Sequence, residues 1–170
     1  MLLESLAYSR EAVAVGEWWR LPASSLAHLS VAHLLGNLLA ASLLVTLLRG
    51  FVAVHVSLAV LCAGALGVGA GVHWATSLTW YVGLSGAIHA LIAYGALRFE
   101  GRRRWVGPTI FAACLLQVAF DQTRSLSWLG EPLAPQAHAW GFATGTLIAL
   151  VAMLRRLPAR LRPLILGSRS

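Results

Sequence analysis

The sequence predicts an all-α fold, a polytopic membrane helical bundle of about five spans. Of its 170 residues, 58% are hydrophobic and only 11% are charged, which is too apolar for a soluble domain of this length. All 13 basic residues are arginines, and they gather at the ends of apolar runs. Such clusters are typical of membrane topology signals. We therefore expect the lipid bilayer as a partner and no nucleic acid.

Residues 1–25 form a polar opening segment that we expect to lie outside the bilayer. The segment holds three glutamates and two arginines, so no window in it is apolar enough to cross a membrane. Trp18 and Trp19 are typical anchors at a membrane–water interface. We predict an outer loop or interfacial segment at 1–25, a transmembrane domain at 26–156 and a basic cytoplasmic tail at 157–170.

Five apolar stretches within the transmembrane domain are candidate spans. In chain order they cover about 26–48, 51–72, 84–99, 105–120 and 136–154. The third is short, because a helix over 86–99 rises only about 21 Å against a hydrocarbon core of about 30 Å. If arginines hold its inner end at the membrane surface, its first residues lie below the outer surface. We then expect a water-filled cavity open to the outer side, because buried polar groups need polar surroundings.

The arginines also indicate orientation. Under this segmentation most of them fall on one side of the membrane, which the positive-inside rule makes the cytoplasm. The other side holds Arg10, Arg20 and Arg124. The beginnings of the third and fifth spans then lie near the outer face.

A serine between two glycines opens the third stretch, in the sequence GLSG at 83–86. Gly83 and Gly86 have no side chains, so a tight turn is allowed and a peptide can approach the backbone closely. The unpaired N–H groups of a helix N-terminus suit a developing oxyanion. Ser85 is therefore a candidate nucleophile, although small-residue runs in membrane helices more often serve packing.

Histidines and an asparagine in the first span are further candidates, since polar side chains are costly in a membrane. His33 and Asn37 are four residues apart, so they share a helix face and can direct two hydrogen-bond donors to one point. His28 lies about 140° round the helix from His33 and is expected to anchor the preceding loop. No carboxylate or cysteine accompanies them, so we predict no metal site and no cofactor.

Two histidines are candidate bases for Ser85. His138 opens the last span in HAWGFATG, where Gly141 and Gly145 form a face that lets a neighbouring helix approach closely. His89 lies one turn after Ser85 on the same helix and is the second candidate.

A third catalytic member would have to be an acid. No carboxylate lies within the predicted spans, so a Ser-His-Asp triad would need Asp121 or Glu131 from the outer loop. The preferred interpretation is a serine–histidine dyad, with the histidine oriented by packing rather than by an acid.

Taken together, these segments resemble the rhomboid family of intramembrane serine proteases over about residues 16–154. Trp19 and Arg20, followed by HLSVAHLLGN at 28–37, are similar to the family's outer loop and second-helix pattern. GLSG is similar to its nucleophile motif, and HAWGFATG is similar to the HxxGxxxG motif of its last helix. The resemblance implies a rhomboid-like helical bundle.

The resemblance also implies roles for individual residues. Ser85 would be the nucleophile and His138 its general base. His33, Asn37 and the Ser85 backbone N–H would hold the oxyanion, and His28 would be structural. The glycines of HAWGFATG would seat the last helix against the serine helix.

Two features depart from the family pattern. The position four after the serine is usually a tyrosine on which the catalytic histidine stacks, and here it is His89. This substitution resembles the rhombosortase branch, which is associated with bacterial surface proteins that carry a GlyGly-type C-terminal tail. Family members also have a span before the WR loop, so we expect the first rhomboid helix to be missing from this sequence and to lie upstream.

The resulting expectation is an intramembrane serine endopeptidase that cleaves single-span membrane protein substrates. It would lie in the bacterial inner (cytoplasmic) membrane with its active site open to the outer, periplasmic side. The alternative is a catalytically inactive rhomboid-like protein that binds membrane clients. A histidine-lined transporter is disfavoured, because the spans contain neither carboxylates nor inverted repeats.

Overall fold

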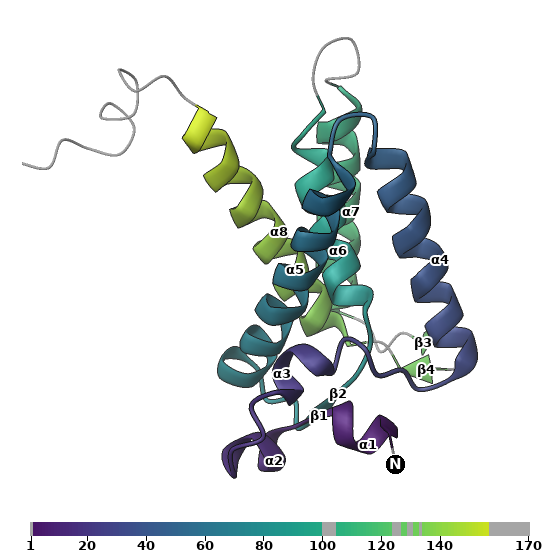
Figure 1. The fold of residues 1–170 in the computed structure, drawn as a ribbon, viewed down its shortest axis with the longest axis vertical. Helices are drawn as coiled ribbons and strands as arrows, with labels where there is room; N and C mark the ends of the chain where they lie inside the picture. The colour runs from purple at the N-terminus through teal and green to yellow at the C-terminus, as the bar shows by residue number, and fades with distance from the viewer. Residues whose placement is uncertain (1, 100–104, 124–126, 129–130, 133, 157–170) are drawn as a thin grey trace, which may run out of the picture.

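The computed structural model describes residues 2–99, 105–123, 127–128, 131–132 and 134–156, and these residues form a helical bundle (Figure 1). The long helices within the described part are α4 (Val31–Leu48), α5 (Val54–Ala75), α6 (Ser85–Ala96), α7 (Val106–Asp121) and α8 (Pro135–Arg156). Each corresponds to one of the five predicted stretches. The all-α fold and the bundle are therefore confirmed.

Short elements gather at the end of the bundle where α4, α6 and α8 begin (Figure 1). They are α1 (Leu2–Leu6), β1 (Tyr8–Ser9), α2 (Arg10–Ala14), α3 (Arg20–Ala23), β2 (Trp80–Tyr81), β3 (Ser127–Trp128) and β4 (Glu131–Pro132). Strand β1 pairs antiparallel with β2, with Tyr8 opposite Tyr81. The opening segment is thus joined directly to the chain that leads into α6.

Helix α6 lies at the centre of the bundle and contacts α4, α5, α7 and α8. Ten of its 12 residues are buried. Its length corresponds to a rise of only about 18 Å, which is well short of a hydrocarbon core. The surrounding helices, rather than lipid, therefore cover most of its surface.

The backbones of α8 and α6 lie in direct contact, as the small-residue face of α8 predicted. A methyl group added at Gly141 would overlap the carbonyl oxygen of Gly86, and one added at Gly145 would overlap that of Ala90. Gly86 in turn faces α8, where a methyl would lie 2.8 Å from the Ala137 carbonyl oxygen. The predicted seating of the last helix against the serine helix is confirmed.

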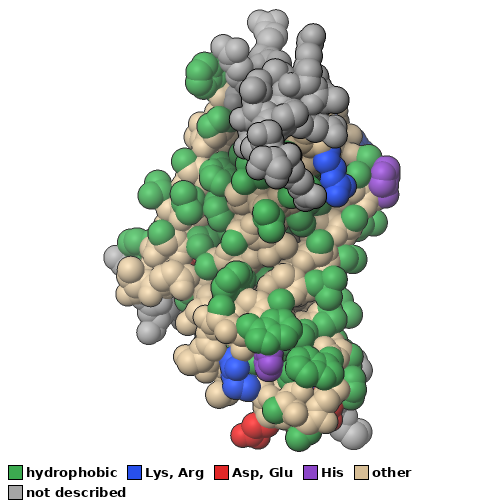
Figure 2. Space-filling model, turned by 90° about the vertical axis from the view of Figure 1, so that its left-hand side faces the viewer, with side chains coloured by type: hydrophobic (Ala, Val, Ile, Leu, Met, Phe, Trp, Pro, Cys, Tyr) green, Lys and Arg blue, Asp and Glu red, His purple; other side chains and the backbone are tan. Residues whose placement is uncertain are grey.

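The outer surface of the bundle is apolar. On the face shown in Figure 2, hydrophobic side chains are spread over the middle, and acidic side chains stand out at the lower end. Within the described residues, α4, α5 and α8 are long and apolar enough to cross a membrane, whereas α7 is a shorter apolar helix of 16 residues. The chain is a multi-pass membrane protein.

The first span begins later than predicted. Residues 26–30 are not helical, because Ser30 has an extended backbone and its side chain accepts a hydrogen bond from the His33 N–H. A serine N-cap of this kind marks where the helix begins. The predicted cytoplasmic tail at 157–170 and the arginines at 102–104 lie outside the described residues.

Candidate active site

Ser85 is the first residue of α6, and the chain before it makes a tight turn at Gly83. The backbone φ of Gly83 is +122°, a conformation that side-chain-bearing residues rarely adopt. The Gly83 N–H donates to the Ser24 carbonyl at 2.9 Å, and its carbonyl accepts a hydrogen bond from the Tyr81 hydroxyl. The turn beneath Ser85 is thus held on both sides.

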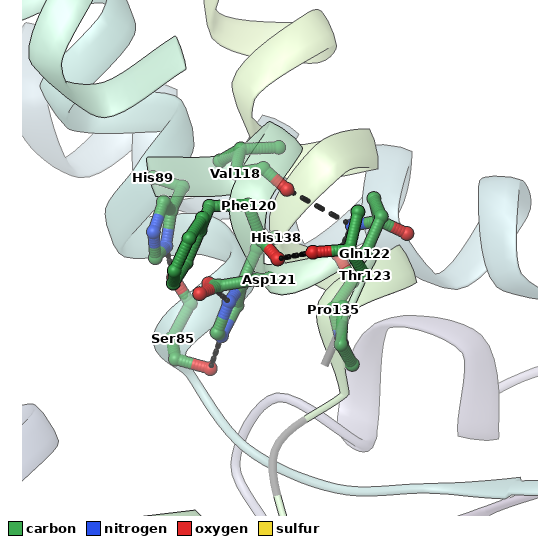
Figure 3. A network of polar contacts seen from close by, with 9 residues as sticks. All are labelled: Ser85, His89, Val118, Phe120, Asp121, Gln122, Thr123, Pro135 and His138. Carbon is green, nitrogen blue, oxygen red and sulfur yellow. Dashed lines mark hydrogen bonds and ion pairs between the residues drawn. The ribbon is translucent and has the colours of Figure 1, made fainter. Parts of the chain in front are cut away.

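His138 meets Ser85 from the first turn of α8. Its Nε2 lies 3.0 Å from the Ser85 Oγ, which is hydrogen-bonding distance (Figure 3). The His138 side chain is almost fully buried. The structure therefore brings the predicted nucleophile and the predicted base together from two different helices.

Asp121 contacts the opposite side of the same imidazole. Its Oδ2 lies 3.3 Å from His138 Nδ1, and both side chains are only 5% exposed (Figure 3). The sequence interpretation preferred a dyad without an acid, whereas the structure places Asp121, one of the two acids considered for a triad, beside His138. Helix α7 continues one residue beyond the predicted span, and this last turn carries Asp121 into the bundle. Glu131, the other acid considered, lies in β4, where side chains are outside the described part.

His89 does not bond the serine hydroxyl. Its Nδ1 lies 2.8 Å from the Ser85 backbone carbonyl, one turn back on the same helix. Its ring stacks on that of His138, with 4.3 Å between centroids and 16° between planes. Of the two candidate bases, only His138 is in contact with the Ser85 hydroxyl oxygen, and His89 packs against its ring.

His33 and Asn37 lie on the α4 side of the site. A methyl group at Gly83 would lie 3.2 Å from His33 Nε2 and 4.0 Å from Ser85 Oγ. The side chains of His33 and Ser85 therefore face a common space next to this glycine. Asn37 is 5% exposed, and its Nδ2 has no hydrogen-bond partner among the described residues. A buried amide donor without a partner is costly unless something binds it at some stage.

His28 anchors the loop before α4, as expected. Its Nδ1 lies 3.2 Å from the Leu26 carbonyl, and its ring meets His33 edge to face at 4.9 Å. Burial lowers the pKa of His28, which favours the neutral ring. The neutral ring supports His33 through packing.

Of the WR pair, Arg20 makes the contacts. Its guanidinium donates to the Glu4 and Ala7 carbonyls and pairs with Glu17, which ties the opening segment together. Trp19 is 57% exposed, as an interfacial anchor would be.

A second arginine was not singled out from the sequence. Arg10 donates hydrogen bonds to four backbone carbonyls at and after the end of α5, those of Val72, His73, Thr76 and Leu78. The last carbonyls of a helix lack intrahelical partners, and a guanidinium is suited to satisfy several of them. The only signal in the sequence was an arginine within the polar opening segment.

Metal ligation has no support within the described residues. Across residues 2–99 and the later described segments, no three or more His, Cys, Asp or Glu side chains are grouped so that they could hold a metal ion. The arrangement suits acyl transfer instead, since a hydroxyl, an imidazole and a helix N-terminus converge.

Together the fold and the site define a multi-pass helical membrane protein with a serine and a histidine in contact inside the bundle. The Rhomboid domain family model matches residues 15–155, which is most of the chain. The chain belongs to the rhomboid family. No curated protein matches the sequence.

Proposed function

We propose that the protein is an intramembrane serine endopeptidase, as members of the rhomboid family generally are. The observation that carries the proposal is the 3.0 Å contact between Ser85 Oγ and His138 Nε2 inside the bundle. A serine hydroxyl is a weak nucleophile until a neighbouring base accepts its proton. His138 is the described imidazole that contacts this oxygen.

The reaction would proceed in two acyl transfers. Ser85 Oγ attacks the carbonyl carbon of the scissile peptide while its proton moves to His138 Nε2. The C–N bond then breaks, and His138 returns the proton to the leaving amine. Water attacks the acyl-enzyme with His138 again accepting a proton, which releases the acid product and restores the Ser85 hydroxyl.

The oxyanion would be held by donors from two helices. The first backbone N–H groups of α6, including that of Ser85, have no partner within the helix and carry its positive dipole end. Asn37 adds a buried amide donor without a partner among the described residues. His33 faces the same space, so these groups can stabilise charge that develops on the substrate oxygen.

The site is proposed to open away from the cytoplasm, on the periplasmic side of a bacterial inner membrane. Ser85 and His138 lie at the beginnings of α6 and α8, whereas Arg98 follows α6 and Arg156 ends α8. By the positive-inside rule the arginine ends face the cytoplasm. Peptide bonds at the opposite membrane surface would then reach the serine.

We propose single-span membrane proteins as substrates, with GlyGly-type C-terminal tails as the class to test first. His89 supports this choice, because histidine in GLSGAIHAL resembles the rhombosortase branch. Glycines favour unwinding of a substrate helix, and an unwound peptide is what a serine nucleophile needs.

The decisive experiment uses the full chain purified in detergent. A fluorophosphonate probe should label the wild-type protein and not Ser85→Ala, and a single-span model substrate with a GlyGly tail should yield two sequenced products. A matched substrate with valines in place of the two glycines tests the tail. Absence of both labelling and cleavage, with the substrate still bound, would instead support the client-binding alternative.

A further inference from the structure

The carboxylate of Asp121 occupies an unfavourable place for a negative charge. It is the last residue of α7, where the negative end of the helix dipole lies, and it is 4% exposed. Burying an ionised carboxylate is costly unless a hydrogen-bonded partner accompanies it. The partner is His138, at 3.3 Å from Oδ2 to Nδ1.

Two contacts control different motions of the His138 ring. The parallel stack on His89 fixes the plane of the ring but permits rotation within that plane. The hydrogen bond from Nδ1–H to Asp121 fixes that rotation, and it also places the proton on Nδ1. With Nδ1 protonated, Nε2 presents its lone pair to the Ser85 hydroxyl.

We infer that Asp121 is a positioning residue that completes a Ser85–His138–Asp121 triad, an inference that rests on the proposed protease function. Asp121 holds His138 in the tautomer that accepts the serine proton. When His138 takes that proton, the adjacent carboxylate stabilises the imidazolium. The rhomboid fold here carries a carboxylate where packing alone was expected to orient the base.

Asp121 acts through its charge and through the tautomer of His138, so the main variant keeps the size of the side chain. Asp121→Asn preserves volume but removes the charge, and an amide can donate to Nδ1 and so favour the wrong tautomer. We expect kcat to fall by about 100-fold to 10,000-fold with little change in KM. Fluorophosphonate labelling of Ser85 should slow by a similar factor.

Gln122→Ala is the matched control, because Gln122 ties the same end of α7 to the start of α8 without contacting His138. Its Nε2 lies 2.8 Å from the Pro135 carbonyl and 3.3 Å from that of Val118. If α7 only held α8 in place, Gln122→Ala and Asp121→Asn would lower thermal stability and activity together. We expect Gln122→Ala to retain labelling within about threefold of wild type, since an exposed hydrogen bond contributes little net stability.

A spectroscopic readout is independent of turnover. In protein labelled with ¹⁵N-histidine, the His138 Nδ1–H should give a strongly downfield proton signal that disappears in His138→Ala and in Asp121→Asn. A signal that survives in Asp121→Asn, or wild-type labelling rates in that variant, would overturn the inference while leaving the protease proposal intact. A wild-type protein that is neither labelled nor active would overturn the protease function, and with it the catalytic role of Asp121.

Discussion

The imidazole rings of His89 and His138 are stacked, with 4.3 Å between their centroids and 16° between their planes. One ring belongs to the helix of the candidate nucleophile and the other belongs to the helix of the candidate base. His89 is itself held by its Nδ1 contact to the Ser85 carbonyl. The stack therefore fixes His138 of α8 relative to α6.

Replacement of His89 should reveal this support. His89→Ala removes the stacking surface, and we expect cleavage to fall by about tens of fold, because a loosened base spends less time in contact with the serine. His89→Tyr retains an aromatic surface and should recover most of the rate. Equal loss of turnover in both variants would show that the Nδ1 contact, and not the stack, is what matters.

Replacement of His138 should be as severe as replacement of the serine. His138→Ala leaves no base in contact with Ser85 Oγ, so probe labelling and proteolysis should both fall to the level of Ser85→Ala. Labelled, active His138→Ala together with inactive His89→Ala would reverse the assignment of the base.

The donors on α4 should act on the transition state. Alanine at His33 or Asn37 should lower kcat by about tenfold to 1,000-fold, because one donor to the oxyanion is lost while the fold is kept. Melting temperatures in detergent should stay close to wild type. A clear fall in melting temperature with normal turnover of the folded fraction would indicate a structural role instead.

The contact between α6 and α8 leaves no room for a side chain at Gly141 or Gly145. Gly145→Ala would drive a methyl group into the Ala90 carbonyl, so we expect a loss of stability of about 1–3 kcal/mol and a larger loss of activity as the helices separate. Gly50→Ala is the matched control, since nothing lies within 4 Å of an added methyl there. Equal melting temperatures for both variants would contradict the close approach.

Tyr81 should contribute stability in its neutral form. Burial raises the pKa of Tyr81, and hydrogen bonds with Gly86 and Ser85 oppose this to a smaller extent. The Tyr81 hydroxyl therefore still donates its hydrogen bond to the Gly83 carbonyl at a pH at which an exposed tyrosine ionises. The unfolded chain releases this proton near pH 10, so the contribution is complete below about pH 10 and declines as the pH rises further. Tyr81→Phe should lower stability by about 1–3 kcal/mol at neutral pH and reduce that alkaline decline. Thermal unfolding at several pH values measures both effects.

The order and approximate limits of the long helices could be predicted from the sequence, because apolar runs and flanking arginines are local signals. The small-residue face of α8 could also be predicted, since the spacing of Gly141 and Gly145 determines which side of the helix a neighbouring helix can approach closely. The start of α4 was placed five residues early, because the apolar run extends past the Ser30 cap.

The partner of His138 could not be predicted in the same way. Whether Asp121 faces the bundle or water depends on the rotation of α7 and on a helix end that differs from the prediction by one residue. The contact of His89 with a backbone carbonyl, rather than with the serine hydroxyl, likewise depends on side-chain geometry that spacing alone does not give. The Asp121 contact arises from tertiary packing between α7 and α8, whereas the His89 contact lies within α6 and depends on the side-chain conformation of His89.

The hydrogen bond from Gly83 to the Ser24 carbonyl has a practical consequence for handling the protein. It joins the turn before Ser85 to the opening segment, whose exposed tryptophans Trp18 and Trp19 prefer the lipid headgroup layer. A detergent that displaces this segment would disturb Ser85 while the buried helices stay folded. Circular dichroism would then report an intact preparation that has lost its reactivity, so probe labelling is the better measure of sample quality.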